Sequence, residues 1–431
     1  MFDLKNVLTV TLSLGALGVC DIAAAQESLF ARDRNTSVLQ RERPEYAPQG
    51  VRAGSFIVRP RVDLSLGYTD NTFAIDPDIN PQFGEQEDFY FVLRPSVQAE
   101  SNWNRHSLVT GAYVETYQHV DIDEANALNA GIFADAVIDV SRTTAIELGG
   151  AYDKLAESRK VSTADIFDDP VDYKRGEVYA GLRQEFGRIR YRGRLSYADY
   201  DYDDAFSLVS NTPVDQDFRD LEETSVLLQA GYAVTRDASV FIRSTFRQRN
   251  FPTPTPGGLN RDSEGYSIAA GVDFDVTRLV RGTLALGYLE EEFDDPALET
   301  IDGVSLDAGL EWFPTELTTV GLSASREVRA SPLIADAAFL TSEVVLGIDH
   351  EVARNIILSA SAGYALDDYE NLDREDERYA LQLAGTYLIN QILSAKLEYT
   401  YEQQESDGTT PGLFAKDYTT NELLLTLTAE R

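Results

Sequence analysis

Few residues in this 431-residue chain could carry chemistry. The only cysteine, Cys20, lies close to the amino terminus, and there are three histidines. The strand pattern described below assigns His106 and His350 to one end of the molecule and His119 to the other. We therefore do not expect them to meet at a metal ion or in a Ser-His pair. The sequence predicts no catalytic residues, no metal site and no cofactor.

Acidic side chains gather in two segments, 199–222 and 366–377. The first contains Asp199, Asp201, Asp203, Asp204, Asp215, Asp217, Asp220 and Glu222, and the second contains Asp367, Asp368, Glu370, Asp373, Glu375, Asp376 and Glu377. Carboxylate oxygens are ligands for divalent cations, but neither segment has the central glycine and final glutamate of an EF-hand. We interpret both as solvated loops in which the like charges repel one another.

Arginines recur on one face of each of two predicted strands. Arg190, Arg192 and Arg194 share one face of the first strand, and Arg243, Arg247 and Arg249 share one face of a strand two further on. Acidic residues on the same face flank them: Asp135, Asp139, Glu147 and Glu177 before, and Asp273, Asp275, Asp307 and Glu311 after. In a narrow lumen these opposed charges would create a field that filters solutes. The alternative is a lattice of salt bridges that only stiffens the wall.

Aromatic residues fall on the same polar face of neighbouring strands. They are Tyr90, Tyr113, Tyr117, Phe133 and Tyr179. Aromatic planes exposed to water would suit the apolar faces of sugar rings. A register slip of one residue would instead turn these side chains toward lipid, because successive residues of a strand face opposite sides.

The elements that must position these residues are β-strands. From Ser55 onward, apolar and polar residues alternate with period two, the signal of a strand with two different faces. We count about eighteen such segments of about ten residues, the length of a tilted transmembrane strand. Eight short turns alternate with nine long connections. This arrangement predicts an all-β, antiparallel up-and-down barrel of about 18 strands, with short periplasmic turns and long acidic extracellular loops.

A soluble β-sandwich or propeller does not fit the polar faces. These faces carry mainly Gly, Ser, Ala, Thr and charged residues, which cannot form a dry core between sheets. A membrane barrel uses the same strands with the apolar face toward lipid and the polar face toward a wet lumen. Tyrosines near strand ends fit an aromatic girdle at the outer rim: Tyr68, Tyr152, Tyr197, Tyr288, Tyr364 and Tyr399.

The amino-terminal segment has the features of a secretory signal. Val7–Cys20 is apolar, and Ala23-Ala24-Ala25 provides a cleavage site. A membrane anchor is the alternative, but a run of this length falls short of the ~20 residues that span a bilayer. We expect a signal peptide at 1–25, a periplasmic tail at 26–54 and an outer-membrane barrel at 55–431, in a Gram-negative bacterium. A formal net charge of −35 argues against a nucleic-acid partner.

One segment carries a family resemblance. Arg43-Pro44-x-Tyr46-x-Pro48-x-Gly50-x-Arg52-x-Gly54-Ser55-Phe56 leads into a strand that ends in Gly67-Tyr68. This resembles the entry segment of the putative β-barrel porin 2 family of proteobacterial outer membranes, and Gly-Tyr strand ends recur over the rest of the chain. The resemblance implies a polysaccharide conduit and supplies no catalytic residues. The final residues, Glu430-Arg431, depart from the aromatic end of many such barrels.

Three functions remain open. The first is a channel for export or passage of polysaccharide or oligosaccharide, and the second is a general diffusion porin for small polar solutes. The third, an outer-membrane barrel hydrolase, needs converging catalytic groups that the sequence does not supply. The expected partners are outer-membrane lipids and lipopolysaccharide and, for a polysaccharide conduit, a separate periplasmic polysaccharide-export protein.

Overall fold

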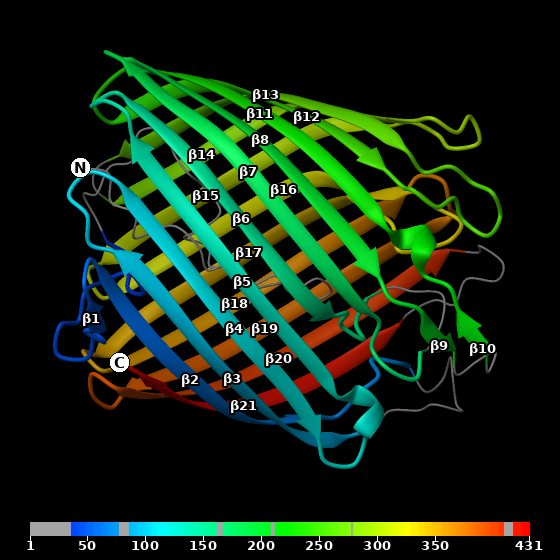
Figure 1. Cartoon of the computed structure of the whole chain (residues 1–431), viewed down its shortest axis with the longest axis horizontal. Helices are drawn as coiled ribbons and strands as arrows, with labels where there is room; N and C mark the ends of the chain where they lie inside the picture. Colours follow the sequence, from blue (N-terminus) through cyan, green and yellow to red (C-terminus); the bar gives the residue numbers. More distant parts are fainter. Residues whose placement is uncertain (1–35, 77–85, 162–166, 208–211, 277–278, 409–416) are drawn as a thin grey trace.

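The computed structural model describes residues 36–76, 86–161, 167–207, 212–276, 279–408 and 417–431. Eighteen long antiparallel strands form one closed barrel, as the sequence predicts (Figure 1). They are β2 (Phe56–Thr69), β3 (Asp88–Ser101), β4 (Ser107–His119), β5 (Ala127–Asp139), β6 (Thr144–Ala156), β7 (Asp172–Phe186), β8 (Ile189–Tyr202), β11 (Leu221–Ala233), β12 (Ala238–Asn250), β13 (Ser263–Val276), β14 (Val280–Phe293), β15 (Ile301–Thr315), β16 (Thr318–Ala330), β17 (Ala338–Ala353), β18 (Ile356–Tyr369), β19 (Arg374–Leu388), β20 (Leu393–Gly408) and β21 (Tyr418–Glu430).

The short elements lie at the two ends of the barrel. β1 (Val51–Ala53) pairs with the start of β2, and the hairpin between them turns at Gly54, whose φ of +62° favours glycine. At the other end lie β9 (Ala205–Ser207), β10 (Thr212–Val214) and two single helical turns, η1 (Asp123–Ala125) and η2 (Asp217–Arg219). Both ends of the described chain lie on the short-turn side (Figure 1). Within the described residues, no helix is long and apolar enough to cross a membrane.

Each strand pairs with its sequence neighbour, and β2 pairs with β21 to close the ring. The closing register runs from Arg61 opposite Glu430 to Thr69 opposite Glu422. Closure leaves no free edge in the barrel, so all its strands can exchange backbone hydrogen bonds with neighbours on both sides.

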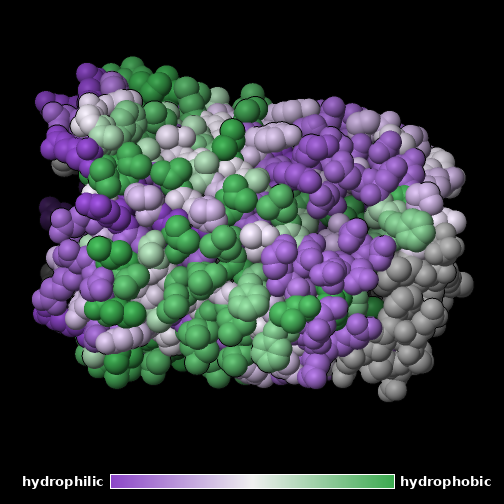
Figure 2. Space-filling model, turned by 60° about the horizontal axis from the view of Figure 1, so that its bottom comes forward, coloured by the Kyte–Doolittle hydropathy of each residue, from purple (hydrophilic) through white to green (hydrophobic). Residues whose placement is uncertain are grey.

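The two faces of the wall have the chemistry that the alternation predicts. Apolar side chains such as Leu423, Leu425 and Leu427 point outward and are 43–50% exposed. On the face of the wall that Figure 2 shows, hydrophobic side chains gather in a band, with hydrophilic side chains toward both ends. The girdle tyrosines also face outward, near the long-loop ends of their strands; Tyr152 is 52% exposed and Tyr288 41%. The lipid-facing band therefore has the layered polarity of an outer-membrane barrel.

The barrel strands are longer than the expected ten residues, at 13 to 16 residues each. Much of the added length is on the long-loop side, where polar cross-strand pairs continue the ladder beyond the apolar belt. Lys174 on β7, for example, is 3.1 Å from Asp201 on β8. Part of the segment 366–377, which the sequence suggested was a loop, is therefore strand: β18 continues to Tyr369 and β19 begins at Arg374.

Candidate functional site

The interior of the barrel is the candidate site, and its wall is lined by paired charges. Arg190, Arg192 and Arg194 all face inward from β8. Arg190 lies 3.1 Å from Glu185, and Arg192 lies 3.2 Å from Glu147. Glu147 on β6 also pairs with Arg183 on β7, at 2.7 Å. The predicted ladder is therefore tied to carboxylates of the adjoining strands.

The second arginine ladder, on β12, has the same character. Arg243 pairs with Asp307, and Arg249 lies 3.0 Å from Glu223 and 3.1 Å from Glu291. Arg247 lies 3.9 Å from Glu223, and it donates a hydrogen bond to the backbone oxygen of Val328 at 2.9 Å. These arginines thus connect β12 to elements on both sides of it.

The other predicted acidic residues also face the lumen. Asp273 accepts hydrogen bonds from Ser239 and Thr283, and Glu311 pairs with Arg281. Asp139 and Asp275 share the inner faces of β5 and β13 with Asp135 and Asp273. The inner wall is therefore a lattice of paired charges.

The five aromatic residues also lie on the inner face, so the register slip considered above does not occur. Several of the rings lie against glycines of a neighbouring strand. A Cβ atom built on Gly67 would lie 2.1 Å from the ring of Tyr90, and one on Gly149 would lie 2.4 Å from the ring of Tyr179. Tyr113 covers Gly131 and Phe133 covers Gly111 in the same way. Glycine at these positions lets each ring lie flat on the wall.

Carboxylates and arginines fix the orientation of these rings. The Tyr113 hydroxyl donates to Asp153 at 3.0 Å, and the Tyr179 hydroxyl donates to Asp135 at 2.5 Å. The Arg194 guanidinium stacks 3.6 Å above the centre of the Tyr179 ring. Nearer the long-loop end, the Tyr90 hydroxyl donates a hydrogen bond to Glu422, and the centre of the Tyr90 ring lies 6.3 Å from that of Tyr117. These five rings, on the inner faces of β3, β4, β5 and β7, make up an aromatic strip to which β6 contributes no ring.

On the long-loop side, one segment after β6 reaches across the lumen. Lys160 pairs with Glu402 on β20 and lies 3.7 Å from Glu422 on β21. Five strand-to-strand steps around the wall separate β6 from β21. Glu422 is also the acceptor for Tyr90, so this contact ends beside the aromatic strip.

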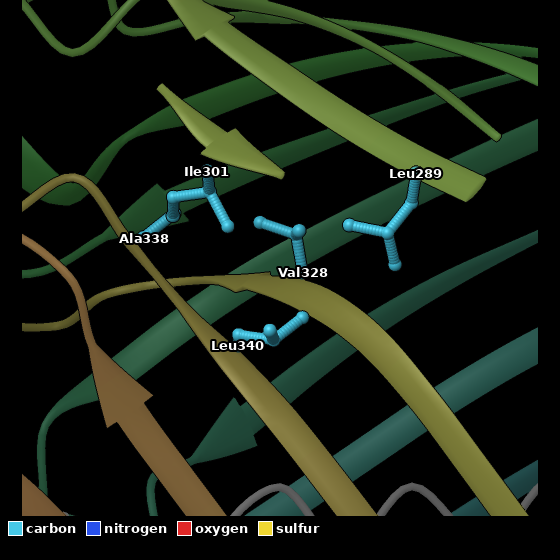
Figure 3. Close-up of a cluster of buried hydrophobic side chains, with 5 residues drawn as sticks. All are labelled: Leu289, Ile301, Val328, Ala338 and Leu340. Atoms are coloured by element: carbon cyan, nitrogen blue, oxygen red, sulfur yellow. The ribbon is translucent and has the colours of Figure 1, made fainter. Parts of the chain in front are cut away.

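On the same side, the ends of β14–β17 and the loops beside them form a packed cap. Leu289, Ile301, Val328, Ala338 and Leu340 make a buried apolar cluster (Figure 3). Beside it, the fully buried Arg261 donates to the backbone oxygens of Ser331 at 3.0 Å and Phe218, and its guanidinium lies 4.3 Å from the centre of the Phe251 ring. Burial lowers the pKa of Arg261 to about 10.

Asp336 lies in the same cap. Its carboxylate accepts a hydrogen bond from the side chain of Asn371 at 3.3 Å. The side chain has no solvent exposure, and burial raises the pKa of Asp336 to about 6.

At the opposite end, the amino-terminal tail occupies part of the mouth on the short-turn side. Val38 is fully buried, and its backbone N–H donates to the Thr319 hydroxyl on β16 at 2.9 Å. The Arg43 guanidinium pairs with Glu351 on β17 at 2.8 Å, and Arg41 contacts the same carboxylate at 3.4 Å. Thr319 and Glu351 both face the lumen, so this tail segment narrows the mouth beside β16 and β17.

The remaining predicted groups do not assemble a reactive centre. His106 precedes β4 at the short-turn end, His119 contacts Asp88 at the long-loop end, and His350 lies near the short-turn end of β17. In the acidic segment 199–222, the carboxylates of Asp204 and Asp215 lie within 4.8 Å of each other and of a third, Asp217. All three side chains are exposed, as in many loops that hold no ion.

Two features of the interior were not predicted from the sequence: the docked tail and the Lys160 contact. Both join residues that are far apart in the chain, and neither tail nor loop has a periodic pattern. The excess of arginine in the tail, opposite an acidic barrel, was the available signal for the first.

The closed 18-strand barrel with an apolar belt and a charged interior defines this protein as an outer-membrane-type, porin-like β-barrel. The chain belongs to the family described as Putative beta-barrel porin 2, whose sequence model matches residues 43–431. No curated protein sequence matches it.

Solved structures resemble the chain at low sequence identity. A mutant of the ferric enterobactin receptor PfeA from Pseudomonas aeruginosa matches with a TM-score of 0.45 and 9% identity, covering 86% of this chain and 80% of that one. OpdL, also from Pseudomonas aeruginosa, matches with a TM-score of 0.44 and 12% identity, covering 88% and 99%. The siderophore receptor PirA from Acinetobacter baumannii matches with a TM-score of 0.44 and 8% identity, covering 86% and 80%.

Proposed function

We propose that this protein is an outer-membrane channel for the export or passage of polysaccharide or oligosaccharide chains, and that it has no enzymatic activity. The aromatic strip is the observation that carries this proposal. Its rings lie on the lumen side of the wall; Tyr90 is buried, whereas Tyr113 and Tyr179 are partly exposed and are oriented by carboxylates. A sugar ring has apolar C–H faces and a polar hydroxyl edge, so an aromatic plane beside carboxylates complements both parts.

Sugar-dependent block of ion current in planar bilayers tests this function. Maltohexaose added to one side should interrupt the wild-type current, and Tyr113→Ala with Tyr117→Ala should raise its half-blocking concentration about tenfold. An aromatic contact contributes ~0.5–1.5 kcal/mol, and 1.4 kcal/mol corresponds to a tenfold change in affinity. Conductance of small ions should stay close to the wild-type value, because neither residue carries charge.

Two control variants separate the ring from the hydroxyl and the lumen from the lipid face. Tyr113→Phe keeps the ring and should keep most of the block. Tyr152→Ala removes a ring that points outward and should not alter the block. If the lumen variants are blocked like the wild type, or if maltohexaose never interrupts the wild-type current, the aromatic strip is not a sugar track.

A general diffusion porin for small polar solutes is the second candidate. The closely matched charges of the lumen favour it, because a wall of paired ions presents a polar surface without strong preference for one solute. This candidate predicts steady ion current that maltohexaose does not block and that the two tyrosine substitutions leave unchanged.

The proposal extends to cellular location and partners. Residues 1–25 act as a cleaved signal peptide, and the mature chain inserts into an outer membrane containing phospholipid and lipopolysaccharide. Amino-terminal sequencing of the membrane-extracted protein should begin at Gln26, and the folded barrel should migrate differently on gels before and after heating. For polysaccharide export, a separate periplasmic protein delivers the polysaccharide to the mouth of the barrel. A crosslinker attached at the short-turn end of the barrel should capture this partner protein. A soluble, monodisperse protein without detergent would contradict the membrane location.

A further inference from the structure

The outer wall of the barrel carries an apolar groove of about 600 Å³ across β8, β11, β12, β13 and β14. Two aligned rows of outward side chains form it. The upper row is Tyr191, Ala230, Ile242, Ala270 and Leu286, and the lower row is Ile189, Tyr232, Val240, Val272 and Leu284.

The groove results from side-chain size. In the upper row, the two alanines alternate with bulky neighbours, so Ala230 lies between Tyr191 and Ile242, and Ala270 lies between Ile242 and Leu286. The wall is therefore hollowed at each alanine and ridged at each large side chain. The lining is almost entirely apolar, and the depression faces the lipid phase, where a hydrocarbon chain fits and water does not.

Two arginines stand at the periplasmic edge of this groove. Arg188 lies in the turn before Ile189, and Arg236 lies in the turn after Tyr232. The two turns are neighbours, since the backbone N–H of Ala233 donates to the backbone oxygen of Arg188 at 2.8 Å. Both arginine side chains are exposed, and neither makes a side-chain hydrogen bond or ion pair with another described residue. The only acidic residue of these turns, Asp237, is partly buried.

The same charge recurs along this rim. The first four short turns, in chain order, carry the exposed arginines Arg105, Arg142, Arg188 and Arg236, and Arg354 is exposed in the turn after β17. The long-loop end, in contrast, carries the acidic segments. Of these arginines, Arg188 and Arg236 adjoin the apolar groove, so this place offers both a phosphate partner and a site for an acyl chain.

We propose that β8, β11 and β12–β14 form a binding site for one anionic phospholipid of the periplasmic leaflet. Its phosphate lies between Arg188 and Arg236, and one acyl chain fills the groove over Ala230 and Ala270. The position of the groove at the short-turn edge of the belt selects a phospholipid over a lipid of the outer leaflet. The site needs no transported solute, so it stands independently of the proposed channel function.

Native mass spectrometry of the full-length, detergent-purified barrel titrated with dioleoyl phosphatidylglycerol tests the site. The wild type should retain one lipid at concentrations that leave other positions empty. The pair Arg188→Ser with Arg236→Ser should lower its apparent affinity about tenfold, as should Ala230→Leu with Ala270→Leu, which fill the hollow. Dioleoyl phosphatidylcholine, whose head group has no net charge, should bind the wild type more weakly and respond less to the arginine substitutions.

Matched controls identify the site and guard against misfolding. Arg142→Ser removes the same charge from a turn without a groove, and Ala360→Leu enlarges an outward alanine on β18, six strands from β12; both should bind like the wild type. Heat-dependent gel migration confirms folding, and the arginine pair lies in exposed turns outside the strands. Equal affinity in all variants, or equal loss in variants and controls, would overturn the proposal in favour of unspecific lipid contact. Dimers whose formation the alanine substitutions abolish would overturn it in favour of a second copy of the chain.

Discussion

Replacing Arg190, Arg192 and Arg194 together with serine should make the channel prefer cations. The immediate patch contains four arginines, Arg183 and the three of the ladder, against the carboxylates of Asp135, Glu147 and Glu185. Its net charge is therefore +1 in the wild type and −2 in the triple variant. Because all these side chains face the lumen, the change acts directly on permeating ions.

The magnitude follows from Coulomb's law with salt screening. One charge about 8 Å from an ion contributes about 0.5 kcal/mol in water. A Debye length of about 10 Å in 0.1 M salt cuts this roughly in half, so three charges contribute about 0.7 kcal/mol. That energy raises the local cation concentration about threefold and lowers the anion concentration equally, so the cation-to-anion permeability ratio rises about tenfold. In 1 M salt, with a Debye length of about 3 Å, the change falls below about twofold.

Reversal potentials in a potassium chloride gradient, measured in planar bilayers at low and at high mean salt, provide the assay. Replacing the same three residues with lysine keeps the charge and should keep the wild-type selectivity, although the planar guanidinium contacts are lost. Arg142→Ser, in an exposed short turn between β5 and β6, should have little effect. A triple serine variant that folds and shows the wild-type reversal potential at 0.1 M would refute the reasoning and leave the ladder a purely structural lattice.

Three further predictions concern stability and the two mouths of the barrel. Glu351→Gln should free the docked tail by weakening its contacts with both tail arginines, making residues 36–50 several-fold more sensitive to protease. Asp336 has a pKa raised by burial from 3.8 to about 6, so its contribution to stability is complete below pH 4 and is lost as pH rises through 6. This pH-dependent change in stability is on the order of 3 kcal/mol. It should be visible in the hydrogen-exchange rates of the cap, and Asp336→Asn should abolish it. Gly149→Ala should lower the unfolding free energy by about 1–3 kcal/mol in urea titrations, because its methyl group would displace the fixed Tyr179 ring. The control Gly176→Ala should cost little, because its methyl group would make only an ordinary contact, 3.9 Å from the Tyr152 ring.

Each of these predictions has an outcome that would contradict it. Unchanged proteolysis in Glu351→Gln would mean that backbone contacts alone hold the tail. Exchange rates in the cap with the same pH dependence before and after Asp336→Asn would assign that dependence to another group. Equal effects of the two glycine substitutions would remove the steric explanation for glycine beneath the rings.

The fold could be predicted closely because a barrel wall repeats one local rule. Alternation from Phe56 to Leu427 determines which side chains face lipid, and the alternation of short and long connections gives the number of strands. The strand ends were less predictable. Beyond the apolar belt, pairs such as Lys174 with Asp201 extend the sheet in water, and this pairing leaves no hydrophobic period in the sequence.

For the candidate site, the alternation of residues along each strand predicted which side chains face the lumen, but it did not predict which side chains pair with one another. It placed Arg192 and Tyr179 inward, as the structure shows. It could not assign Glu147 to Arg183 and Arg192 together, since that depends on the register between three strands. The docked tail was harder still, because the hydrogen bond from Val38 to Thr319 spans 281 positions in the chain.

The pairing of β2 with β21 has a consequence for the order of assembly. The first and last strands of the wall meet only after all the intervening hairpins are in place, so ring closure has the longest sequence separation of any pairing in the barrel. Until then, two strand edges with unpaired backbone N–H and C=O groups remain open to any other extended chain, including another unfinished barrel. Biogenesis is therefore governed by a single late event, and a chaperone that shields these two edges would protect the precursor more effectively than one that shields the hairpins between them.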